Sequence, residues 1–230
     1  MDSRILREFK ISARHTIPVL AGYGFLGFAF GLLLRTQGYS PLLPVVMSLI
    51  VFSGALEFAA VPMLSAAFDP ISAFVIGIML SARHLFYGIP MLKKYSGTGK
   101  SKLFLIFGLT DEAFSILSAN EVPEEVRPKS FYLWVTFLNY FYWVSFTALG
   151  ALLGSLISFD LEGLDFALTA LFIVLFLDQL KDRQGRISGF AGLIACAIVL
   201  MLVGSKAFVL VSMAAILVIL LGGRKVIGRE

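Results

Sequence analysis

The stretch PISAFVIGIMLSARHLFYGIPML, residues 70–92, decides how the rest of the chain is interpreted. It is apolar and long enough to cross a lipid bilayer, which takes about 20 helical residues. Yet Ser81, Arg83 and His84 lie near its middle, where burying a charge costs about 2.5 kcal/mol or more. Such a charge persists only if a neighbouring helix supplies a counter-ion or if the segment lines a wet cavity. It therefore marks either a structural ion pair or a substrate or proton site, and intramembrane charges are by default functional.

The composition places the whole chain among membrane proteins. Of its 230 residues, 58% are hydrophobic and 15% are charged, whereas soluble domains carry about 25% charged residues. Apolar segments of about 20 residues recur from end to end, so we expect an all-α, polytopic helical bundle with about eight membrane segments. The expected parts are a basic cytoplasmic segment at 1–16, a single transmembrane domain at 17–222 and a basic cytoplasmic tail at 223–230. The single cysteine, Cys196, is expected to be a small buried packing residue.

The positions of Lys and Arg orient the bundle. The expected spans are 17–34, 41–68, 70–92, 103–117, 131–157, 165–180, 187–204 and 207–221. With a cytoplasmic N-terminus, these crossings place twelve basic residues inside and five outside, in accord with the positive-inside rule. The loop 93–102 is the exception, because it is basic yet lies outside. Making both 70–92 and 103–117 re-entrant from the inside would move this loop to the cytoplasmic side.

Residues 41–68 carry signs of a broken helix. They are longer than one crossing needs, and Gly54 and Pro62 flank Glu57 near their centre. Transporters use such discontinuous helices to present helix ends at mid-membrane depth.

The segment 103–117 is unusual because it is shorter than one crossing needs. It also contains the adjacent acids Asp111 and Glu112. Discontinuous or re-entrant helices are therefore expected between residues 50 and 118. An inverted repeat would suit a transporter, but no internal sequence match stands out.

Small residues predict close helix contacts. Gly24, Gly27 and Gly31 lie near one face of the first span, and Gly150 and Gly154 form a GxxxG pattern. Small residues of this kind let two helices approach closely. Exposure of the backbone to a substrate is the alternative for the first of these faces.

Aromatic residues fill the first half of the span 131–157. Part of this run is expected to form a belt at the membrane–water interface. Asn139 is its polar exception.

Five short motifs follow one another along nearly the whole chain. They are FSGALEF (52–58), SARHLFYG (81–88), TDEAF (110–114), YW with later glycines (142–154) and DFALTALF (165–172). Together they resemble the AzlC-type large subunit of bacterial branched-chain amino-acid exporters. Two positions depart from that pattern, because Ser81 stands where Asn is common and Glu57 where Gln is common. The resemblance implies a multi-pass exporter of the bacterial inner (cytoplasmic) membrane that requires a small four-span subunit of the AzlD type.

The implied substrates, such as leucine, isoleucine and valine, are zwitterions with a small apolar side chain. Arg83 suits the carboxylate because a guanidinium pairs bidentately, and Glu57 or Asp111 suits the ammonium group. The remaining substrate-binding candidates are polar residues of the same spans: Ser53, Ser81, Tyr87 and Asn139. Export is expected to use proton antiport, with carriers among the acids and the histidine: Glu57, His84, Asp111 and Glu112.

Three alternatives stay open. A transporter of another small metabolite, such as methionine, would need similar buried charges. A non-transporting scaffold subunit would explain the glycine faces but not those charges. An intramembrane enzyme would rely on Ser81 and His84, but no catalytic motif surrounds them and metal spacing such as HExxH is absent. We therefore expect no catalysis, no metal, no cofactor and no nucleic-acid partner.

Overall fold

The computed structural model describes residues 3–65, 69–119, 122–154 and 183–204, together with isolated positions between 173 and 222. All regular structure among them is helical. The chain divides into two compact units, residues 1–164 and 165–230, and each is described by itself. The motif at 165–172 and the basic tail at 223–230 lie outside the described residues.

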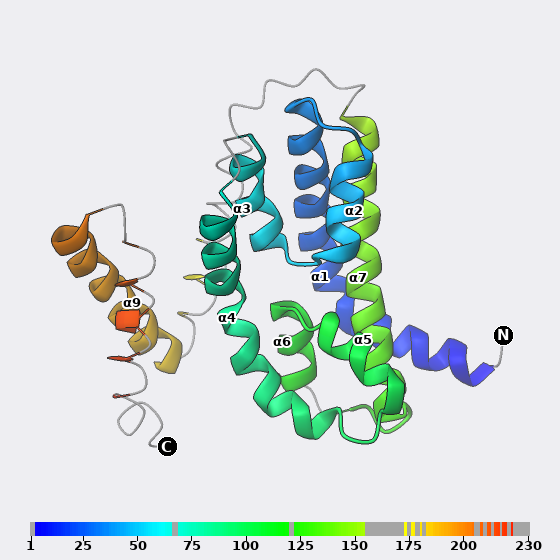
Figure 1. Cartoon of the computed structure of the whole chain (residues 1–230). Coiled ribbons are helices and arrows are strands. Elements are labelled where there is room, and N and C mark those ends of the chain that lie inside the picture. Colours follow the sequence, from blue (N-terminus) through cyan, green and yellow to red (C-terminus); the bar gives the residue numbers. More distant parts are fainter. Residues whose placement is uncertain are drawn as a thin grey trace. The chain divides into compact units, whose positions relative to one another are not determined.

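Three described helices are long and apolar enough to cross a membrane. They are α1 (Ser3–Thr36), α7 (Pro128–Leu153) and α9 (Arg183–Val203). The first two belong to the first unit, and α9 is the long helix of the second (Figure 1). The predicted all-α membrane class is therefore confirmed, while the count of eight segments stays a prediction.

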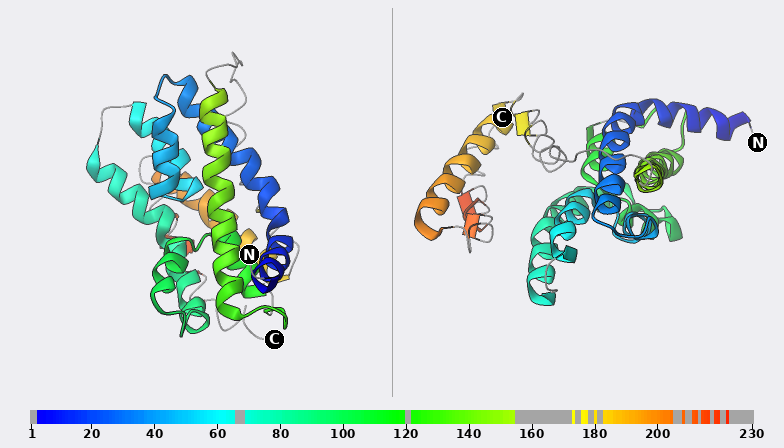
Figure 2. Two further views of the ribbon diagram at one scale, coloured as in Figure 1. Left: turned by 90° about the vertical axis from the view of Figure 1, so that its right-hand side faces the viewer. Right: turned by 90° about the horizontal axis from the view of Figure 1, so that it is seen from above.

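The first unit is built on α1 and α7, which lie side by side and run parallel (Figure 2). Contacts advance together along both helices, from Glu8 with Arg127, through Thr16 with Tyr142, to Gly31 with Thr147. The two helices therefore begin at one end of the unit and finish at the other.

Glycines let the two helix backbones touch. A methyl group on Gly31 would collide with the backbone of Thr147 and Ala151, and one on Gly150 would collide with the backbone of Phe28. The predicted packing role of both glycine faces is thus confirmed, because no larger side chain fits between the two backbones.

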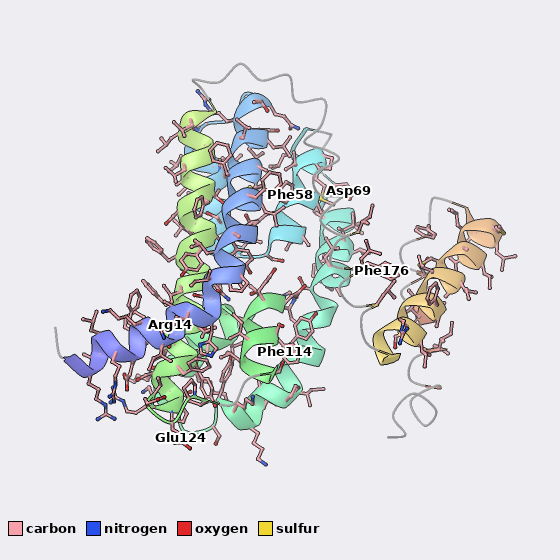
Figure 3. All side chains as sticks on the ribbon, turned by 180° about the vertical axis from the view of Figure 1, so that it is seen from behind. Arg14, Phe58, Asp69, Phe114, Glu124 and Phe176 are labelled. Carbon is pink, nitrogen blue, oxygen red and sulfur yellow. The ribbon has the colours of Figure 1, made fainter. Side chains whose placement is uncertain are left out.

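The basic N-terminal segment is the start of α1 and not a separate helix. Its part around Arg14 runs obliquely to the rest of α1 (Figure 3), and Pro18 lies inside the helix where the missing backbone bond permits a bend. Glu8 is buried and accepts hydrogen bonds from Arg127 Nε at 2.9 Å and Nη2 at 3.1 Å. These bonds lower the pKa of Glu8 to about 2, so the pair ties this segment to the start of α7 as two charges.

Residues 41–68 do not form the single crossing expected of them. Helix α2 (Leu42–Ile50) leads from the end of α1 to the middle of α7, where the Tyr140 hydroxyl donates to Leu49 O at 3.0 Å. The chain then breaks at residues 51–53, and Phe52 takes a left-handed φ of +44°. The predicted discontinuity is confirmed.

Helix α3 (Gly54–Ser65) turns back from this break toward the end of α1. Its first turn contacts Trp143 through Glu57. Phe58, which follows Glu57 in α3, packs against Phe30 near the end of α1, with ring centroids 5.4 Å apart. Helices α2 and α3 therefore form a re-entrant hairpin.

Residues 102–119 form a second hairpin from the other end. A short 3-10 turn, η1 (Gly99–Ser101), leads into α5 (Lys102–Phe107), which reaches the middle of α7. After a break at 108–110, α6 (Asp111–Ala119) returns to a core near the start of α7 that contains Leu117 and Phe131. The segment 103–117 is therefore broken into two short helices that double back, while its re-entry from one side of a membrane stays a prediction.

Helix α4 (Pro70–Lys94) connects the two hairpins and runs antiparallel to α1 and α7. It begins after α3. Met91 in its last turn and Tyr95, the residue after its end, pack beside Phe131. Helix α4 therefore passes through the whole unit as one continuous helix, unlike 103–117, and does not double back within the unit.

This topology gathers positive charge at one end of the first unit. We call it the basic end, because it holds the start of α7, the N-terminal segment of α1 and the loop 93–102. Of the twelve Lys and Arg residues up to position 154, ten lie there: Arg4, Arg7, Lys10, Arg14, Lys93, Lys94, Lys100, Lys102, Arg127 and Lys129. Arg35 lies at the opposite end, where α1 and α7 finish, and Arg83 lies within α4.

Cysteine labelling tests the two hairpins. In a Cys196→Ala background, Gln37→Cys and Asp69→Cys are expected to react with an impermeant maleimide from one membrane face, and Ser96→Cys from the other. All three positions are exposed, and the hairpin α2–α3 returns the chain to the side where it entered. Eight crossings would instead put Gln37 and Ser96 on the same face and Asp69 on the other.

Glycine substitutions test the contact between α1 and α7. Gly150→Ala is expected to destabilise the protein by about 1–3 kcal/mol, because overpacking forces the two backbones apart. Gly22→Ala is the control, since nothing lies within 4 Å of the added methyl group. The measurement is the thermal unfolding temperature in detergent, and equal values for both variants would contradict the close contact.

Candidate functional site

The tips of the two hairpins meet on one face of α7. The rings of Phe52, in the first break, and Phe107, which directly precedes the second break, lie 6.0 Å apart between centroids. Both flank Tyr140, at 4.9 Å and 5.9 Å. Both half-helices α3 and α6 therefore start at mid-depth in the unit, where the aromatic cluster covers the broken backbone.

A glycine at each break lets the backbone contact side chains of α7 directly. A methyl group on Gly54 would collide with the Trp143 ring, and one on Gly108 would collide with Thr136. Thr136, Tyr140 and Trp143 are spaced four and three residues apart, so they share one face of the helix. A single helical face thus carries both tips.

Glu57 lies in the first turn of α3 and is completely buried. Its Oε1 accepts a hydrogen bond from the Ser53 backbone N–H at 3.0 Å. Both carboxylate oxygens accept from Trp143 Nε1–H, at 3.1 Å each. The N-terminus of α3 adds a favourable dipole. These contacts bind the Glu57 carboxylate through neutral donors, and none of them is a charged side chain.

Glu112 lies in the first turn of α6, beside Asp111. The Tyr23 hydroxyl of α1 donates to Glu112 Oε2 at 2.6 Å and lies 3.0 Å from Thr110 Oγ1. Thr110 in turn accepts from the backbone N–H of Ala113 at 3.3 Å, as a helix-capping residue does. Glu112 is thus held by an aromatic donor in the same way as Glu57.

The two donors touch each other. The rings of Tyr23 and Trp143 pack edge to face, with centroids 5.2 Å apart and an interplanar angle of 71°. We call the set Glu57, Trp143, Tyr23, Glu112 and Thr110 the carboxylate network. It links both half-helices through the α1/α7 pair.

Tyr23 and Trp143 were missed by the sequence interpretation. Trp143 belongs to the run that was expected in part to form an interfacial belt, but it is 3% exposed and lies in the interior. Phe137 and Phe141 are the outward-facing members of that run. Two features of the sequence could have indicated that these residues are internal. Trp143 lies one turn from the polar Asn139, and Tyr23 lies between two glycines.

Asn139 is completely buried on the same face of α7, between Thr136 and Trp143. Neither its amide nitrogen nor its amide oxygen has a hydrogen-bond partner among the described residues. Leaving a buried polar group unpaired costs about 1–3 kcal/mol. Its position between the two breaks makes it the candidate for contact with a polar ligand.

The candidates on α4 are only partly described. Tyr87 stacks on Phe114 of α6, with ring centroids 4.6 Å apart. His84 Nδ1 lies 3.1 Å from the Ser81 backbone oxygen one turn earlier, so this contact does not involve the Ser81 hydroxyl. The Arg83 side chain lies outside the described residues, and its pairing with Glu57 or Asp111 stays a prediction.

No group of His, Cys, Asp and Glu side chains in the described part of the chain is arranged to hold a metal ion.

Comparison with known proteins establishes the family. The family model described as AzlC protein matches residues 18–157. The chain belongs to the AzlC family. This confirms the resemblance seen in the motifs, and the matched region contains both hairpins and the carboxylate network.

Several relatives match over most of their length. The chain is 44% identical over 223 residues to the branched-chain amino acid transport protein AzlC of Bacillus subtilis (strain 168), covering 97% of this chain and 88% of that protein. It is 34% identical to a membrane protein of Helicobacter pylori (strain ATCC 700392 / 26695), with 96% of both chains covered. It is 32% identical to the inner membrane protein YgaZ of Escherichia coli (strain K12), covering 76% of this chain and 75% of that one. No solved structure matches the chain.

Proposed function

We propose that this AzlC-family chain is the large subunit of a secondary transporter that exports branched-chain amino acids in exchange for protons. The family and the Bacillus subtilis relative, named as a branched-chain amino acid transport protein, support amino-acid transport. The observation that carries the proposal is the pair of half-helices that start at mid-depth, each with a glutamate in its first turn that accepts a hydrogen bond from an aromatic donor. Discontinuous helices of this kind form the substrate and ion sites of secondary transporters.

The substrate would be bound as a zwitterion between the two breaks. The N-termini of α3 and α6 favour its carboxylate, and Arg83 on α4 is the proposed cationic partner. Glu57 and Asp111 are the proposed partners of the ammonium group. Asn139 offers both an amide donor and an amide acceptor, which suits a ligand with groups of both kinds.

The remaining candidates take lesser roles in the proposal. The hydroxyl groups of Ser53, Ser81 and Tyr87 would bind the polar end of the substrate. Coupling to protons would use the ionisable groups near the breaks, which are Glu57, His84, Asp111 and Glu112. A carboxylate that binds the ammonium group in one step and a proton in another gives exchange of the two.

The proposed orientation has the basic end in the cytoplasm. The positive-inside rule favours this, since ten of twelve Lys and Arg residues up to position 154 lie there. The loop 93–102, which contradicted the rule under eight crossings, now agrees with it. The N-terminus is then cytoplasmic in the inner membrane.

We further propose that the chain works with a small four-span subunit of the AzlD type. Exposed apolar side chains on α4, such as Ile71 at 75% and Phe74 at 68%, need a cover of lipid or of another membrane subunit. The family resemblance is what favours the subunit.

Efflux of preloaded labelled leucine from cells tests the proposal. Efflux is expected only when the chain is expressed with the four-span subunit from the same genome. Glu57→Ala and Asn139→Leu are expected to lower the rate about tenfold or more, because each removes a polar partner of the substrate.

The matched control is Glu125→Ala, which removes an exposed carboxylate from the loop before α7 and is expected to leave efflux unchanged. Unchanged efflux in both site variants, at normal levels in the membrane, would contradict the site. Efflux of labelled methionine but not leucine would favour the alternative substrate.

A further inference from the structure

The two hairpins occupy equivalent places in the first unit. Each follows a long helix, α2–α3 after α1 and α5–α6 after α4, and each enters from the end where that helix finishes. Because α1 and α4 are antiparallel, the hairpins enter from opposite ends and meet in the middle. This is the arrangement of an inverted repeat.

The two breaks share the spacing of two residue types. Phe52-Ser53-Gly54-Ala55-Leu56-Glu57 and Phe107-Gly108-Leu109-Thr110-Asp111-Glu112 both place a glutamate five residues after a phenylalanine. The matched residues make matched contacts. Both phenylalanines pack on Tyr140, and both glutamates accept a hydrogen bond from an aromatic donor on a long helix.

The two donors come from different helices, so each hairpin is held by its own hydrogen bond. Trp143 of α7 holds Glu57 on α3, and Tyr23 of α1 holds Glu112 on α6. Since α1 and α7 are in backbone contact through glycines, they form a fixed support. Each half-helix is therefore bonded to that support through a donor of its own.

We propose that α3 and α6 are the two gates of alternating access, and that Trp143 and Tyr23 are positioning residues that latch them through Glu57 and Glu112. The α3 gate closes the path to the opposite end of the unit, and the α6 gate closes the path to the basic end. This rests on the proposed function only in requiring a transport path between the hairpins. It does not depend on which substrate is carried.

The ligand releases the latch through the carboxylate. Hydrogen bonds to an ionised carboxylate are about twice as strong as neutral ones. A glutamate that accepts a proton, or that turns to the ammonium group of a substrate, therefore holds its aromatic donor less firmly.

Sided labelling tests the latches. Ala55→Cys in the first turn of α3 and Ala113→Cys in the first turn of α6 serve as reporters in a Cys196→Ala background, in membrane vesicles of both orientations. Trp143→Phe is expected to raise the labelling rate of Ala55→Cys from the opposite end, and Tyr23→Phe that of Ala113→Cys from the basic end. Each increase should be about tenfold or more, as expected for loss of a hydrogen bond to a charged group.

The matched control is Tyr142→Phe, which removes the hydroxyl that bonds Thr16 and lies outside the carboxylate network. It is expected to change neither rate. An increase in both reporters with either variant would indicate general loosening and would overturn the proposal, as would no increase in either. The labelling uses no substrate, so a sided pattern without leucine efflux would retain the gates and reject only the proposed substrate.

Discussion

The backbone contact between α1 and α7 is the constraint on which the rest of the first unit depends. Glycine at positions 27, 31 and 150 lets the two parallel helices approach until only main-chain atoms separate them. This contact brings Tyr23 and Trp143 together, although they are far apart in sequence. It also presents one continuous face of α7 to both hairpin tips.

Two carboxylates lie beside that contact, the buried Glu57 and the half-buried Glu112, and each accepts a hydrogen bond from an aromatic donor. An aromatic N–H or O–H and the N-terminus of a half-helix replace the water that Glu57 and Glu112 lose. Neutral donors of this kind hold a charge without cancelling it, whereas an arginine would form a silent ion pair. Glu8 and Arg127 are such a pair, and they lie at the periphery, where they fasten the N-terminal segment.

The sequence was sufficient for features that depend on local chemistry. The glycine faces, the break near Glu57 and the acids near residue 111 are visible as residue types at helical spacing. The reversal of α3 was not, because it depends on a left-handed φ at Phe52 and on the distant Tyr140. Tyr23 and Trp143 were missed because aromatic residues in a span resemble lipid-facing ones, and the Phe-to-Glu spacing that the two breaks share involves too few residues to stand out.

The re-entrant hairpins also bear on how the chain enters the membrane during synthesis. Helices α2, α3, α5 and α6 have 9, 12, 6 and 9 residues, each too short to insert as an independent span. Their broken backbones tolerate the bilayer only when covered by protein, yet the covering helix α7 is made after both of them. The hairpins must therefore stay at the membrane surface or in the insertion machinery until α7 has been synthesised. Helix α7 then completes the unit by covering both of them.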